Sequence, residues 1–162
     1  MTVKINNSTS PARLGRRRNG VALIEFAFVV PILIAMLLGI IEFGWFVKNQ
    51  LQVANAVRDG ARDAAVGLTT DQIRQRVINR ASGVPGMPDN MTLEMKWDAG
   101  TGSSYAYNDT LGNNDAGTFN NAPTGSLIQV KATVTSQSLT GFPFLLNKNW
   151  SATVIMRRES NG

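Results

Sequence analysis

The sequence contains no cysteine and no histidine. Without cysteine, the chain can form neither a disulfide nor a thiolate metal site. Without histidine, it lacks the commonest metal ligand of proteins and the commonest general base of enzymes. No nucleophile–base pair, phosphate-binding loop or cluster of metal ligands replaces them. The composition therefore favours a protein that binds or builds over an enzyme, and we predict no catalytic residues, no metal and no cofactor.

Acidic residues are absent from the first twenty residues, and this absence explains the charge of the whole chain. The 162 residues suffice for one modest domain and carry a formal net charge of +5. Eleven basic residues beyond residue 20 are balanced by the chain's eleven acidic ones. The tail lacks the aromatic platforms and basic face of a nucleic-acid interface, so we predict no nucleic-acid partner. Its basic residues are Lys4, Arg13, Arg16, Arg17 and Arg18.

A long apolar run follows this tail, and its only charged residue is Glu25. Residues 21–41 read VALIEFAFVVPILIAMLLGII. About 20 apolar residues in a helix span a hydrocarbon core of roughly 30 Å. Basic residues directly before such a run are typical of its cytoplasmic flank. We predict a single transmembrane helix in contact with membrane lipid, with the N-terminus in the cytoplasm and the remaining chain extracytoplasmic.

A cleaved secretory signal is the main alternative for this run. Its apolar stretch would span roughly 7–15 residues and end in a small-x-small site. Ala54-Asn55-Ala56 has that form but lies too far beyond the run. We therefore expect the segment to stay attached.

Two residues inside the run are not explained by anchoring alone. Pro31 removes a backbone donor and predicts a kink, although membrane helices also tolerate proline. Glu25 costs about 2.5–3.5 kcal/mol at a bilayer interior, so it needs a partner unless it reaches water at the cytoplasmic edge.

The residues around Glu25 resemble the leader and junction of a prepilin. Basic residues are followed by Gly20, four apolar residues, Glu25 and Phe26. In type IV pilins and pseudopilins, a membrane aspartic peptidase cuts after this glycine. The resemblance implies cleavage between Gly20 and Val21, which makes residues 1–20 a leader. The new amine of Val21 would lie about one helical turn from Glu25, and the two charges can pair within one subunit or between neighbouring subunits.

A longer segment, residues 25–65, resembles the TadE-like family of minor pseudopilins of the tight-adherence (Flp) pilus system. The resemblance implies a role in pilus assembly in a bacterial inner membrane, with a periplasmic domain. It also implies three kinds of partner: the peptidase, other pilins and pseudopilins, and inner-membrane assembly components. The alternative is a single-pass, membrane-anchored binding or adhesion domain that no such peptidase processes. The matching positions are Glu25, Phe26, Pro31, Gly39, Glu42, Phe43, Gly44, Arg58, Asp59, Gly60, Ala61 and Arg62.

The helix is predicted to continue beyond the membrane through residues 42–67, where Gly67 is a helix stop. Apolar residues recur there at spacings of three or four, which indicates one buried stripe. Charges of alternating sign at residues 58, 59, 62 and 63 indicate a solvated, salt-bridged face. The alternative is that Arg58 and Asp59 dock to other pilin subunits. The predicted stripe comprises Val47, Leu51, Ala54, Val57, Ala61, Ala64 and Leu68.

Residues 69–162 are predicted to form a small extracytoplasmic domain. Residues 69–72 read as a capping box that opens a second, short helix. Three segments, 91–97, 128–135 and 150–157, alternate apolar and polar residues and indicate three half-buried strands. An antiparallel sheet with one face on the long helix covers both apolar surfaces. The predicted fold class is therefore an α+β membrane protein.

Two connections remain open. The loop at 98–126 is rich in Gly, Asn, Ser, Thr and Asp. It holds possible oxygen ligands for calcium but lacks the EF-hand spacing, so we predict a solvated loop. The apolar run 142–146 closes the open end of the sheet or, alternatively, contacts a partner.

Overall fold

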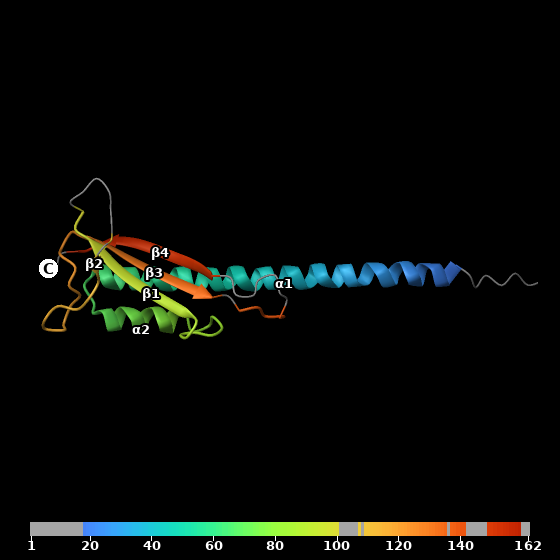
Figure 1. Cartoon of the computed structure of the whole chain (residues 1–162), viewed down its shortest axis with the longest axis horizontal. Helices are drawn as coiled ribbons and strands as arrows, with labels where there is room; N and C mark the ends of the chain where they lie inside the picture. The colour runs from blue at the N-terminus through green and yellow to red at the C-terminus, as the bar shows by residue number, and fades with distance from the viewer. Residues whose placement is uncertain (1–17, 101–106, 108, 136, 142–148, 160–162) are drawn as a thin grey trace, which may run out of the picture. The chain divides into compact units, whose positions relative to one another are not determined.

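The computed structural model describes residues 18–100, 107, 109–135, 137–141 and 149–159. It contains two helices, α1 (Arg18–Ala65) and α2 (Thr70–Arg80), and four strands (Figure 1). Most of the basic tail and the apolar run 142–146 lie outside the described residues. The strands are β1 (Met91–Asp98), β2 (Asp109–Thr110), β3 (Leu127–Thr135) and β4 (Asn149–Arg157). These elements confirm the α+β prediction.

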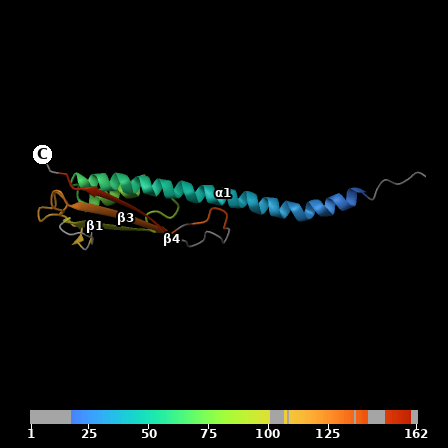
Figure 2. The same ribbon diagram turned by 90° about the horizontal axis from the view of Figure 1, so that it is seen from above.

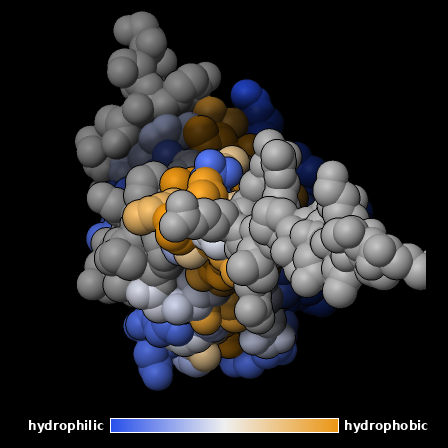
Figure 3. All heavy atoms as spheres, turned by 90° about the vertical axis from the view of Figure 1, so that its right-hand side faces the viewer, coloured by the Kyte–Doolittle hydropathy of each residue, from blue (hydrophilic) through white to orange (hydrophobic). Residues whose placement is uncertain are grey.

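The helix α1 contains 48 residues and continues through Pro31. It begins three residues before the predicted start at Val21. It is long and apolar enough to span a membrane, and no residue of its most apolar stretch is buried. Large apolar side chains of the N-terminal unit, residues 18–39, are open to solvent; Phe26 is 62% exposed and Phe28 is 75% exposed. In Figure 3, hydrophobic side chains gather in the middle of the view.

Gly67 ends α1 as the sequence predicts. It has a φ of +95°, a left-handed conformation that glycine adopts without strain. Its N–H donates to the carbonyl of Ala64 at 3.0 Å, and the N–H of Leu68 donates to that of Asp63 at 3.0 Å. These two bonds form a Schellman motif. Thr69 then caps α2, and both bonds of the predicted capping box with Gln72 are present.

The four strands form one antiparallel sheet in the order β2-β1-β3-β4. The three predicted strands are confirmed, each within one residue of its expected bounds. The two-residue strand β2 is an addition, because so short a segment carries no periodicity of its own. It lies inside the connection predicted as a solvated loop, and it pairs with Lys96 and Trp97 of β1.

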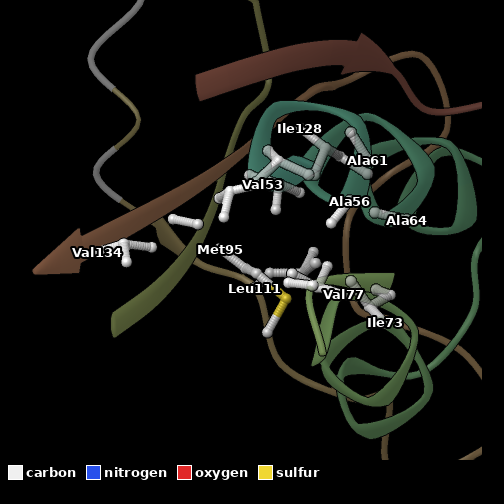
Figure 4. Close-up of a cluster of buried hydrophobic side chains, with 14 of the residues drawn as sticks. Val53, Ala56, Ala61, Ala64, Ile73, Val77, Met95, Leu111, Ile128 and Val134 are labelled. Atoms are coloured by element: carbon white, nitrogen blue, oxygen red, sulfur yellow. The ribbon is translucent and has the colours of Figure 1, made fainter. Parts of the chain in front are cut away.

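One face of the sheet packs against both helices. Figure 2 shows the C-terminal part of α1 lying along the sheet. The side chains labelled in Figure 4 come from α1, α2 and the sheet, together with Leu111 directly after β2. The opposite face carries polar residues, including Glu94 and Lys131 with 3.6 Å between carboxylate and ammonium. The core includes Val53, Ala56, Val57, Ala61, Ala64, Ile73, Val77, Met95, Ile128, Val130 and Val134.

The predicted stripe on α1 was wrong at Leu51, whose side chain is 60% exposed. Val57, Ala61 and Ala64 are buried as predicted, but in the preceding turns the stripe passes through Val53 and Asn49. Leu51 therefore belongs to the solvent side of the helix. Spacing alone placed it one face away because apolar residues occur on both sides of this segment.

Candidate functional site

The residues of the predicted cleavage junction lie at the exposed start of α1. Gly20 and Val21 are both helical, and Val21 is 58% exposed. Glu25 is exposed, and its carboxylate has no hydrogen-bond or ion-pair partner among the described residues. A Cβ built at Gly20 or at Gly39 would meet no atom within 4 Å. This part of the motif thus makes no packing contact that would explain its residues.

Glu42 behaves differently, because its side chain turns into the domain. It is only 4% exposed. Its Oε1 accepts the backbone N–H of Leu139 at 3.0 Å, and its Oε2 accepts the N–H of Thr140 at 3.1 Å and the hydroxyl of Thr140 at 2.9 Å. Hydrogen bonds to a carboxylate are among the stronger ones in proteins. The hydrogen bonds of Glu42 therefore attach the β3–β4 connection to α1.

The neighbours of Glu42 in the motif point outward. Phe43 is 62% exposed, and a Cβ built at Gly44 would meet no atom within 4 Å. Within residues 42–44, one side of α1 thus binds the β3–β4 connection, and the other side presents an open, apolar surface.

Asp59, Gly60 and Ala61 form the contact between α1 and α2. A Cβ at Gly60 would collide with a methyl group of Val77 and lie 3.6 Å from a methyl group of Ile73, so only glycine permits this approach. Ala61 is fully buried. The carboxylate of Asp59 lies 2.8 Å from Nε of Arg80. The central part of the motif is therefore accounted for by packing inside the domain.

Of the four charges at residues 58–63 that were predicted to form a solvated, salt-bridged face, only the two aspartates form salt bridges in the described structure. Asp59 and Asp63 pair with arginines of α2, and Asp63 lies 2.8 Å from Arg76 Nε. Arg58 and Arg62 are exposed, and neither has a partner among the residues that the structure describes. The alternation reflects two sides of the helix: aspartates toward α2 and arginines toward solvent.

Two polar residues missed by the sequence reasoning close the C-terminal end of α1. Arg158 is buried, and its guanidinium donates to the carbonyl of Ala65 at 3.0 Å. Asn120 is also buried and donates to the carbonyls of Ala64 and Leu68 at 2.8 and 3.0 Å. Burial lowers the pKa of the Arg158 guanidinium. A cation at this helix end also complements the helix dipole. Neither residue sits in a local motif, so only the tertiary structure identifies them.

The possible calcium ligands of the loop are the side-chain oxygens of Asp109, Asn113, Asn114 and Asp115, and two of these four residues use that oxygen in other contacts. The side-chain oxygen of Asn113 accepts the N–H and hydroxyl of Thr70 at 2.8 and 3.0 Å. That of Asn114 accepts the N–H groups of Thr118 and Phe119 at 2.9 and 3.1 Å. Within the described ranges, no three acidic side chains gather where they could hold a metal ion. Asn113 thus holds the loop against the start of α2, and Asn114 closes a turn within the loop.

The fold and the site define an α+β domain that follows a candidate membrane span. The motif residues lie along α1, which contains the span and continues into the domain. Residues 20–62 match the family model described as TadE-like protein. This match confirms the resemblance seen in this segment of the sequence. The TadE-like family is pilus-associated, and the apolar part of α1 fits a membrane-anchored protein. Neither the curated proteins nor the solved structures contain a match to the chain.

Proposed function

We propose that this chain is a minor pseudopilin that takes part in assembling a tight-adherence (Flp) pilus. A prepilin-type peptidase cuts it between Gly20 and Val21. The mature chain lies in the bacterial inner membrane through residues 21–41, with the later residues in the periplasm. The observation that carries the proposal is the family match, which begins at Gly20 itself and includes Glu25.

The exposure of the N-terminal helix supports this function. Its large apolar side chains are exposed, and a Cβ built at Gly20 or Gly39 would meet no atom within 4 Å, so this surface is free for lipid or other subunits to cover. After cleavage, the amine of Val21 supplies a positive charge for Glu25, whose carboxylate has no partner among the described residues. Such a pair would link a new subunit to its neighbour. The partners are other pilins or pseudopilins and inner-membrane assembly components.

Mass spectrometry of the membrane-extracted protein tests the proposal. In cells that carry the peptidase, we expect the N-terminal residue to be Val21. Finding Met1 in those cells would overturn the pseudopilin assignment and favour the alternative, a membrane-anchored binding or adhesion domain. A Gly20→Leu variant is the matched control, because a side chain at this position should block entry into the peptidase site and leave residues 1–20 attached.

A further inference from the structure

The solvent side of α1 carries a regular row of residues that the domain does not use. Leu51, Asn55, Arg58 and Arg62 follow one another at spacings of four, three and four, so they share one helix face. All four are exposed. The row ends in the two arginines that have no described partner. The family match extends to Arg62, although no packing contact explains either arginine.

The row borders a groove between α1 and α2. One part has a volume of about 380 Å³ and is lined by residues that include Asn55, Arg58 and Arg80. A second part of about 270 Å³ is lined by residues that include Arg62 and Arg76. Four arginines line the two parts against two aspartates, which leaves two positive charges in excess. Both aspartates already pair with arginines of α2, so the excess charge lies at Arg58 and Arg62.

We propose that this groove binds an acidic segment of another pilus protein, whose carboxylates pair with Arg58 and Arg62. The proposal rests on the proposed function, because it names the chemistry of one assembly partner. Two guanidinium groups one helical turn apart match carboxylates spaced along a helix or extended segment, and each can be bidentate. The exposed side chain of Leu51 continues the row and supplies apolar contact.

Charge and distance disfavour two other occupants. Arg58 lies about 24 Å along α1 from Glu42, near the predicted membrane boundary. This distance is about three Debye lengths at physiological ionic strength, so lipid head groups contribute little attraction. A second copy whose two-fold axis passed through the groove would place the arginines against arginines. An acidic partner chain is the occupant that satisfies the charges.

The test uses the full chain in neutral phosphatidylcholine nanodiscs and a fluorescent oligoglutamate peptide as the probe. We expect the peptide to bind, and the double variant R58Q/R62Q to bind it about tenfold more weakly. Arg74→Gln is the matched control: Arg74 is also exposed and lies on α2, but it does not line the groove. Its affinity should equal that of the wild type, and R58K/R62K should recover part of the lost affinity because it keeps the charge.

Three results would overturn the proposal: equal weakening by Arg74→Gln, no peptide binding by the wild type, or self-association that depends on the same arginines. In cells, R58E/R62E should abolish pili while R74E does not, with both proteins stable and carrying Val21 at the N-terminus. Normal pili in R58E/R62E would also overturn the proposal. The N-terminal residue keeps the two failures apart, because Met1 in the wild type contradicts the pseudopilin function, whereas peptide binding reports on the groove alone.

Discussion

Glu42 stands directly after the apolar run, yet its carboxylate faces the domain. It accepts three hydrogen bonds from Leu139 and Thr140, which lie 97 and 98 residues further along the chain. A single side chain thus fixes the connection between β3 and β4 beside the end of the predicted membrane segment. Its place in the family motif has a physical explanation in this chain, since its carboxylate is the acceptor that holds three donors of the β3–β4 connection against α1.

Replacing Glu42 tests this role at the residue scale. Glu42→Ala removes three hydrogen bonds to a carboxylate, but Leu139 and Thr140 are exposed and their donors can bond to water, so we expect the free energy of unfolding to fall by about 1–2 kcal/mol. The amides of Leu139 and Thr140 should exchange hydrogen faster. Glu42→Gln retains one acceptor oxygen and should lose less. Hydrogen exchange and urea unfolding in detergent measure both effects.

The control is Glu94→Gln on the outer face of the sheet. Glu94 lies 3.6 Å from Lys131, and its side chain is 44% exposed. Such exposed pairs contribute about 0–1 kcal/mol, so this variant should remain close to the wild type. Unchanged protection of the Leu139 and Thr140 amides in Glu42→Ala would contradict the role given to Glu42.

At the scale of elements, the contact between α1 and α2 depends on a residue without a side chain. Gly60→Ala places a Cβ against Val77, so the helices must separate or Val77 must shift. We expect a loss of about 1–3 kcal/mol, as is usual for overpacked cores. Thermal unfolding followed by circular dichroism in detergent measures it.

Gly44→Ala is the matched control on the same helix. The site is open, so the added methyl meets nothing, and the helix should gain up to about 1 kcal/mol from the better propensity of alanine. If the two variants unfolded at the same temperature, the close approach at Gly60 would not matter to stability.

At the scale of the whole molecule, the proposed function gives the apolar part of α1 the role of assembly, and the α+β domain follows it. Glu25→Ala removes a carboxylate that costs about 2.5–3.5 kcal/mol in the bilayer interior, so membrane insertion should be unchanged or improved. Assembly should nevertheless be impaired, because the amine of Val21 loses its partner. Membrane fractionation and electron microscopy of pili measure the two effects. Glu94→Ala is the control for a lost surface charge, and normal piliation in Glu25→Ala would contradict the ion pair.

Much of the fold could be predicted from the sequence, for reasons that differ by element. The capping box at Thr69 and Gln72 and the stop at Gly67 are local, because each needs only neighbouring residues. The strands β1, β3 and β4 can be predicted because apolar and polar residues alternate along each of them. The strand β2 does not, because two residues have no period and depend on pairing with β1. Leu51 was misplaced because a spacing of three or four is compatible with either side of the helix.

The candidate site was predicted less completely. The motif residues could be identified from their order along the chain, but their roles could not be separated. Arg58 and Asp59 are adjacent, yet one faces solvent and the other pairs with Arg80. Only the position of α2 in the fold distinguishes the roles of these two residues. Arg158 and Asn120 escaped prediction because their partners are carbonyl groups at and just beyond the end of α1, which lie at least 50 residues away in the sequence.

The sequence by itself determined the apolar run, its basic flank, the order of helices and strands and the family motif, because each depends on composition or on short-range periodicity. The tertiary structure decided which motif residues are already used inside the domain. Glu42 and Asp59 are used there, and Arg58 and Arg62 remain available. The physical reason is that partners such as Leu139 and Thr140 come near Glu42 only when β3 and β4 pack along α1.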